Sequence, residues 1–182
     1  SGRKVRACCP LLLTLMGTFQ LLLLGLSVTM FLVTEGVPPG FTRAQWFNEQ
    51  HVQYPKTIAS NDNIYCNNEM RRINNHTSRC KSFNTFLNYL GPAVIKVCLE
   101  PNISCMNPAM QNCHNSTTDV PLTNCQLTSG RYPNCSYRGT SKQAYFVVAC
   151  DPPVPADHSR SKLLPVHLDS TTSQPDPILL SL

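Results

Sequence analysis

Three short stretches of the chain carry side chains that could do acid–base or electrostatic chemistry. NEQH ends in His51, CKSFNTF places Lys81 directly after a cysteine, and LLPVHLD contains His167. An imidazole titrates near neutral pH, so one histidine can accept a proton while another, already protonated, donates one. A lysine supplies a positive charge where negative charge develops. Taken singly, each has an ordinary explanation: a solvated strand end for Lys81, and a surface or core position for the histidines.

The chain begins with a basic head followed by a long apolar run. Three basic residues precede a stretch from position 7 to 34 that contains no charged residue. This pattern is typical of a secretory signal peptide. We therefore expect residues 1–36 to be a signal peptide and the mature, secreted chain to begin near Val37. An uncleaved anchor is the alternative, because the run exceeds the roughly 20 residues that span a bilayer. Either way, the rest of the chain lies outside the cytosol.

Cysteine usage agrees with export. Beyond the first 36 residues the cysteines number eight, an even count that predicts a disulfide framework with about a hundred possible pairings. No CxxC pair occurs, so no structural zinc site is expected. Sequons predict glycosylation at Asn75, Asn102 and Asn115, with a weaker one at Asn134. Without the first 36 residues the net charge is +3, which suits a local anionic site but not a polycationic membrane disrupter.

Periodicity predicts helices first and strands later. Helices are expected over 41–51, with Thr42 as the cap, over 66–80, where the NN pair ends the helical run, and near 90–99. Strands are expected in CKSFNTF, PLTNCQLT, SGRYPNCSYR, KQAYFVVAC and LLPVHLD. YPKTIASNDN and DPPVPADHSRSK are expected to be loops. This order favours an α+β fold.

The cysteine ladder and the chemistry-bearing motifs occur together and in one order. The intervals between the eight cysteines are 14, 18, 7, 8, 12, 10 and 15, and QH, CKSFNTF, LTSGRYPNCSYR and LLPVHLD are set among them. This arrangement resembles the pancreatic-type ribonuclease (ribonuclease A) superfamily over roughly residues 41 to 169. QWF, the LTSG turn and the long loop before His167 are most similar to the eosinophil-type and skin-type host-defence branches.

The resemblance implies a ribonuclease A-like fold. Its expected features are a V-shaped antiparallel sheet, three helices, an RNA-binding cleft and four disulfides, in a domain over residues 37–169. The implied pairs are Cys66–Cys125, Cys80–Cys135, Cys98–Cys150 and Cys105–Cys113. Residues 170–182, polar with an apolar tip, are expected to be a disordered tail, either inert or folded across the cleft.

The resemblance also assigns roles. His51 corresponds to the general base, His167 to the general acid, and Lys81 to the cation beside the phosphate. RNA carries its own nucleophile, the 2′-hydroxyl, so no metal, cofactor or protein nucleophile is expected. Gln50 would donate to the phosphate and Asp169 would orient His167.

The remaining implied positions concern substrate recognition. Thr85 would read a pyrimidine, because one hydroxyl can both donate and accept. The other substrate-binding positions are Asn84, Asn112 and Leu168, the last standing where pancreatic enzymes have an aromatic residue. An extra residue between Cys105 and Cys113 departs from the family pattern beside Asn112.

Several positions depart from strongly basic relatives. Trp46, Glu49 and Met106 stand where such relatives place cations, so we expect weaker binding of long RNA and a shallower salt dependence. Trp46 and Phe47 are expected in the core. The adjacent pair Arg71 and Arg72 is expected on a solvated helix face.

The sequence therefore predicts a secreted, monomeric endoribonuclease that cleaves single-stranded RNA after pyrimidines through a 2′,3′-cyclic phosphate. A host-defence role and a cytosolic ribonuclease inhibitor as partner are suggested by the resemblance alone. After signal cleavage no stable membrane insertion is expected. The alternative from another class is a non-catalytic secreted antimicrobial or signalling module on the same scaffold.

Overall fold

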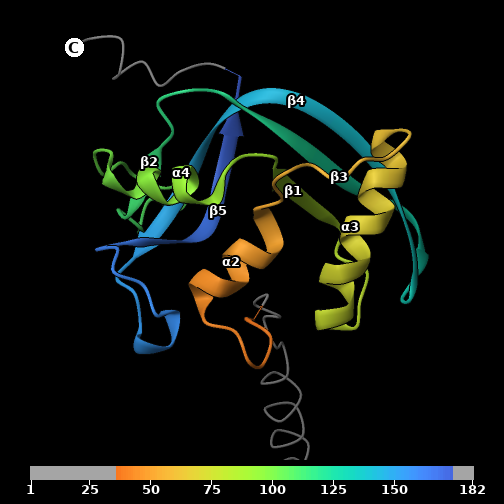
Figure 1. The fold of residues 1–182 in the computed structure, drawn as a ribbon, viewed down its shortest axis with the longest axis horizontal. Helices are drawn as coiled ribbons and strands as arrows, with labels where there is room; N and C mark the ends of the chain where they lie inside the picture. Colours follow the sequence, from red (N-terminus) through yellow and green to blue (C-terminus); the bar gives the residue numbers. More distant parts are fainter. Residues whose placement is uncertain (1–35, 174–182) are drawn as a thin grey trace, which may run out of the picture. The chain divides into compact units, whose positions relative to one another are not determined.

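The computed structural model describes residues 36–173. The expected signal peptide and the end of the C-terminal tail lie outside these residues. Within residues 36–173, no helix is both long enough and apolar enough to cross a membrane. Residues 36–173 form three α-helices and a five-stranded antiparallel sheet (Figure 1). Its elements are α2 Arg43–His51, α3 Asp62–Thr77, β1 Phe83–Leu87, α4 Gly91–Lys96, η1 Val97–Leu99, β2 Cys113–Asn115, β3 Val120–Arg131, β4 Asn134–Asp151, η2 Pro155–Asp157 and β5 Leu164–Thr172.

Helix α2 begins where its capping residue predicts. The Thr42 hydroxyl accepts from the backbone N–H of Gln45, and the Gln45 side chain accepts from the backbone N–H of Thr42. This reciprocal capping box satisfies two backbone donors that have no partner within the helix. The helix ends at His51 and presents Trp46 and Phe47 to the interior, which confirms their assignment to the core.

Helix α3 starts earlier than the sequence predicted. Asn61 caps it by accepting from the N–H of Ile64, so Asp62 and Asn63 belong to the helix and not to the preceding loop. The Asn pair at 74 and 75 does not end the helical run, because Asn74 is buried with its amide hydrogen-bonded inside the fold. The helix ends instead at Thr77, and its C-cap Ser78 adopts the left-handed conformation with φ of 52°.

The prediction of a separate strand in SGRYPNCSYR was wrong. β3 runs through Arg131, the chain turns at Tyr132 and Pro133, and β4 begins at Asn134. Gly130 has φ of 94°, and a Cβ there would meet the carbonyl oxygen of Asn134 at 1.9 Å, so the turn needs glycine at this point. The stretch is therefore a hairpin, whose two arms belong to two longer strands.

Strand β4 joins the two halves of the sheet. It is 18 residues long, and its first part pairs with β3, which in turn pairs with β1. Its second part lies between β2 and β5 (Figure 1). β5 continues to Thr172, beyond the expected domain end at Asp169, because Ser170, Thr171 and Thr172 still pair with β4. The first three residues of the expected disordered tail are thus part of the sheet.

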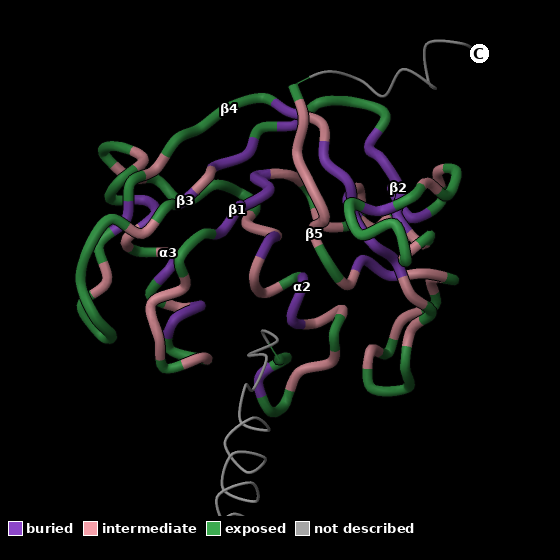
Figure 2. The backbone as a smooth tube through the Cα atoms, turned by 180° about the vertical axis from the view of Figure 1, so that it is seen from behind, coloured by how far each residue is buried: buried purple, intermediate pink, exposed green. Residues whose placement is uncertain are grey.

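The hydrophobic core forms two principal clusters, and α2 contributes to both. Phe47 packs with residues of α4, β3 and β4, whereas Trp46 packs with residues of α3. β1 is divided in the same way, because Leu87 belongs to the first cluster and Phe86 to the second. Figure 2 shows buried residues along the inner parts of the strands and an exposed β3–β4 hairpin end. The fold therefore holds α2 and β1 firmly at its middle.

All four implied disulfides are present, which confirms the expected pairing. Cys66–Cys125 ties α3 to β3, and Cys98–Cys150 ties η1 to the end of β4. Cys80–Cys135 fixes the residue before Lys81, and Cys105–Cys113 closes a short loop.

The three expected glycosylation sites differ in exposure. Asn75 and Asn102 are exposed. Asn115 lies in β2 at 7% exposure, and its side-chain oxygen has no hydrogen-bond partner. A glycan on this side chain would not fit the folded protein, so the structure argues against the expected modification at Asn115.

Candidate active site

The three candidate catalytic residues come from three separate elements. His51 is the last residue of α2, Lys81 precedes β1, and His167 lies in β5. α2 packs against both β1 and β5. The arrangement brings the three side chains close enough that the charges of Lys81 and His167 both act on His51.

His51 is held in one tautomer. Its Nδ1 lies 2.8 Å from the backbone carbonyl oxygen of Thr85, and a carbonyl oxygen only accepts, so Nδ1 carries the proton. The lone pair is then on Nε2. Burial, and next the charge of Lys81, lower the pKa of His51 to about 3, with a smaller contribution from His167, while the bond to Thr85 opposes the shift. His51 is therefore a neutral base at neutral pH.

Lys81 has a firmly held backbone. Its N–H donates to the Asn74 side-chain oxygen at 2.9 Å, and its carbonyl accepts from the Tyr137 hydroxyl at 2.7 Å. Burial raises the pKa of the Tyr137 phenol, so it keeps the proton it donates. Together with the neighbouring Cys80–Cys135 disulfide, these bonds fix the root of a flexible side chain. Sequence reasoning missed both partners: Tyr137 is 56 residues from Lys81, and Asn74, although only seven residues away, belongs to the preceding helix α3.

We expect the Cys80→Ala/Cys135→Ala variant to separate stability from activity. Loss of this cross-link should lower the free energy of unfolding by about 2–4 kcal/mol. The contacts from Asn74 and Tyr137 remain, so kcat/KM should fall much less than in Lys81→Ala. Denaturant unfolding and steady-state kinetics on the same preparations measure both effects. A loss of activity as large as that of Lys81→Ala would show that the disulfide alone holds the lysine.

The Lys81 ammonium lies beside two amides. Nζ donates to the Asn84 side-chain oxygen at 3.2 Å, and the Asn84 amide nitrogen donates to the backbone carbonyl of Gln50 at 2.8 Å. Asn84 is 1% exposed, so its side chain orients Lys81 and the end of α2 instead of contacting a substrate directly. The Gln50 side-chain oxygen also accepts from Lys81 Nζ, at 3.2 Å.

Asp169 does not orient His167 as the sequence analysis expected. Both of its carboxylate oxygens accept from the backbone N–H of Met106, at 3.2 and 3.1 Å. His167 itself is exposed on β5. The carboxylate therefore ties β5 to the loop closed by Cys105–Cys113. That disulfide and Asp169 form a group with metal-like spacing, but its two sulfurs are bonded to each other and are not thiolates.

The remaining recognition residues have partners that bear on their roles. The Thr85 hydroxyl donates to the Asn124 side-chain oxygen at 2.9 Å, a partner that sequence reasoning missed. The Asn112 amide nitrogen donates to the carbonyl of Cys150 and to Asp151, which argues against its expected contact with a downstream base. Leu168 packs against the first core cluster.

Arg72 is more than a solvated residue of the α3 face. It forms an ion pair with Glu49 of α2, a second one with Glu69 at 3.7 Å, and it donates to the Glu49 carbonyl at 3.0 Å. It thereby links α3 to α2. Arg71, its neighbour, is exposed as expected.

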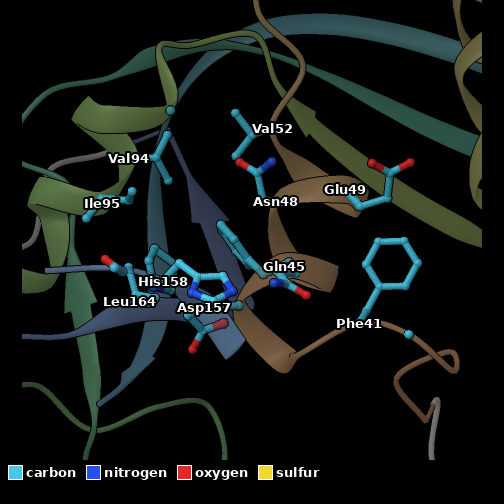
Figure 3. A pocket seen from close by; sticks show the side chains of 16 residues that line it. Phe41, Gln45, Asn48, Glu49, Val52, Val94, Ile95, Asp157, His158 and Leu164 are labelled. Atoms are coloured by element: carbon cyan, nitrogen blue, oxygen red, sulfur yellow. The ribbon is translucent and has the colours of Figure 1, made fainter. Parts of the chain in front are cut away.

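A pocket of about 570 Å³ lies at a different part of α2 (Figure 3). Its lining includes Phe41, Asn48, Val94, His158 and Leu164, but none of the three candidate catalytic residues. Among the other histidines, His114 is buried with Nδ1 2.6 Å from the Glu100 carbonyl, a structural contact. Neither His114 nor His158 therefore lies with the three candidate catalytic residues.

The fold and the site together define a class: a small, disulfide-linked α+β protein in which α2, the segment before β1, and β5 bring together a neutral histidine, a lysine and a second histidine. Comparison with known proteins agrees with this class. The chain belongs to the pancreatic ribonuclease family, whose model matches residues 42–169.

Curated relatives cover most of the chain. It is 45% identical to "Ribonuclease 7" from Homo sapiens over 161 residues, 88% of this chain and 93% of that protein. It is 45% identical to "Ribonuclease 8" from Homo sapiens over 162 residues, 89% of this chain and 94% of that protein. "Ribonuclease K6" from Bos taurus is 44% identical over 133 residues, 73% of this chain and 80% of that protein.

Proposed function

We propose that this protein is a secreted endoribonuclease that cleaves single-stranded RNA on the 3′ side of pyrimidines, through a 2′,3′-cyclic phosphate. The observation that carries the proposal is the state of His51. Its Nδ1–H is bonded to the Thr85 carbonyl, and its lowered pKa keeps Nε2 unprotonated at neutral pH. Names of relatives at 45% identity support the substrate class.

The proposed reaction needs only groups that lie at this site. His51 Nε2 takes the proton of the 2′-hydroxyl, and the oxygen attacks the adjacent phosphorus. The bond from phosphorus to the 5′-oxygen breaks, and protonated His167 gives its proton to that leaving oxygen. Lys81 stabilises the extra negative charge on the phosphoryl oxygens during the step. The products are a 2′,3′-cyclic phosphate and a free 5′-hydroxyl.

The proposed test uses the oxidised protein secreted from cells that express the full chain. It is incubated in EDTA with a single-stranded oligoribonucleotide that contains one pyrimidine. Cutting after that pyrimidine, with a cyclic phosphate as the first product, supports the enzyme and the mechanism. Absence of cutting would contradict the proposal and favour the non-catalytic secreted module.

Base preference is expected to depend on Asn124. With its proton donated to Asn124, the Thr85 oxygen is an acceptor, which suits the N3–H of uracil. N3 of cytosine is an acceptor, so the Thr85 hydroxyl must donate to it. A neutral Asn124 permits this, because its side chain can turn and donate its NH₂ to the Thr85 oxygen, which frees the hydroxyl proton for cytosine. A carboxylate can only accept. Asn124→Asp should therefore raise the ratio of kcat/KM for UpA over CpA by about 10-fold.

The control for this prediction is Asn124→Ala, which removes both orientations and should lower kcat/KM for both dinucleotides without a comparable change in their ratio. An unchanged ratio in Asn124→Asp would mean that Asn124 does not set the donor state of Thr85.

The biological context is also part of the proposal. We propose export, a monomeric state, a host-defence role and binding by a cytosolic ribonuclease inhibitor, on the basis of the cysteine framework and family membership. Killing of bacteria by wild type and by His167→Ala separates a role that needs RNA cleavage from one that does not.

A further inference from the structure

Two hydrogen-bond donors from neighbouring residues lie at one end of the Gln50 side-chain amide. Trp46 Nε1 lies 3.0 Å and Lys81 Nζ 3.2 Å from the end of the Gln50 amide that must be its oxygen, because both neighbours only donate. The NH₂ group of Gln50 is then directed away from both donors. An NH₂ group only donates, so it suits an acceptor such as a phosphate oxygen.

We propose that Trp46 is a positioning residue for phosphate recognition, whose indole N–H fixes the Gln50 amide so that its NH₂ group faces the substrate phosphate. This inference rests on the proposed function. It gives a polar role to a residue that the sequence analysis assigned to the core alone.

The indole is well placed for this role. Trp46 and Gln50 are four residues apart on α2, so their side chains share one face of the helix. Trp46 is 5% exposed, and its ring is enclosed by Phe41, with centroids 5.4 Å apart, and by His76 at 5.7 Å. A buried indole N–H needs an acceptor. Gln50 supplies it, so the enclosed ring and the amide hold each other.

Substrate binding makes Trp46 more important than Lys81 for this orientation. Lys81 Nζ donates to the side-chain oxygens of both Gln50 and Asn84. When a phosphate arrives, the ammonium turns donors toward it, and its bond to Gln50 weakens. The neutral indole cannot move in this way. Without Trp46 the amide could rotate and present its oxygen to the phosphate, which would replace attraction by repulsion.

A double-mutant cycle tests the inference, using oxidised protein secreted from the full chain. The variants are Trp46→Phe, Gln50→Ala and the double variant, and the substrate is UpA. Phenylalanine keeps most of the ring packing but has no N–H. We expect Trp46→Phe to lower kcat/KM about 5- to 10-fold, which is the loss of one hydrogen bond. In the Gln50→Ala background the same change should have almost no effect.

The readouts separate positioning from packing. A merely structural role would lower Tm and would give the same loss of kcat/KM with or without Gln50; that additive result would overturn the inference. The Kd for uridine 3′-phosphate is measured on all four proteins as a second readout. It should weaken with the same dependence on Gln50.

The second readout also separates the inference from the proposed function. If wild type binds uridine 3′-phosphate with a non-additive cycle but does not cut UpA, the inference stands and the ribonuclease proposal fails. If wild type neither binds nor cuts, both fail. If it cuts UpA and Trp46→Phe matches wild type in both readouts, only the inference fails.

Discussion

His51→Ala and His167→Ala are each expected to lower kcat/KM for UpA by about 10²–10⁴-fold. Each removes one of the two proposed proton transfers. The other three histidines have different surroundings: His114 is buried against Glu100, His158 lines a different pocket, and His76 packs against Trp46 and pairs with Glu49. His158→Asn is a matched control, because His158 has φ of 49° and asparagine tolerates that conformation. The control should retain wild-type kcat/KM. Equal losses in the control and in the two active-site variants would contradict the assignment.

The pH dependence should carry the signature of His51. Its pKa is about 3, below the ordinary 6.5, so the acid limb of kcat/KM for wild type should lie well below pH 6. Stability follows from the same shift. Between pH 6.5 and 3 the unfolded chain binds a proton at His51 and the folded chain does not, so the free energy of unfolding falls as the pH is lowered through this window. His51→Ala should remove up to about 1.4 kcal/mol per pH unit from that slope.

Lys81→Ala is expected to lower kcat by about 10²–10³-fold, because the charge beside the phosphate contributes mainly in the transition state. The same change should move the acid limb of kcat/KM to higher pH, since the charge of Lys81 is the second cause that lowers the pKa of His51. Full pH–rate profiles of wild type and variant measure both effects.

Lys96→Ala is the matched control for this variant. Lys96 is an exposed lysine in the last turn of α4 and is not part of the site. The Lys96→Ala substitution removes the same net charge as Lys81→Ala and should leave kcat and the acid limb of kcat/KM unchanged. A loss of kcat in Lys81→Ala without a shift of the acid limb would show that Lys81 and His51 are not electrostatically coupled.

Local features of the chain were predictable. Thr42 correctly predicted the start of α2, where it forms a capping box, and helical spacing correctly placed Trp46 and Phe47 in the interior. The even set of cysteines predicted a disulfide framework, but their spacing left about a hundred pairings open, and only the family resemblance selected the four that occur. The same resemblance suggested His51, Lys81 and His167 as the candidate catalytic residues.

The errors have a common physical source. The turn within SGRYPNCSYR and the continuation of α3 past Asn74 depend on partners elsewhere in the chain. The same is true of Asp169, whose carboxylate accepts from the backbone N–H of Met106 and not from His167. Periodicity describes only neighbours along the chain, so it cannot say which distant group a polar side chain will meet.

Local sequence patterns were enough to predict the disulfide-rich class, the cap and interior face of α2, and the candidate catalytic motifs. The partners that orient these motifs are set by the tertiary structure. There the Thr85 carbonyl is hydrogen-bonded to His51, Asn74 and Tyr137 are hydrogen-bonded to the backbone of Lys81, and the Trp46 indole N–H is hydrogen-bonded to the Gln50 amide. A buried hydrogen-bonding group must be paired, and for the candidate catalytic residues most of those partners come from other elements, which only folding brings into reach.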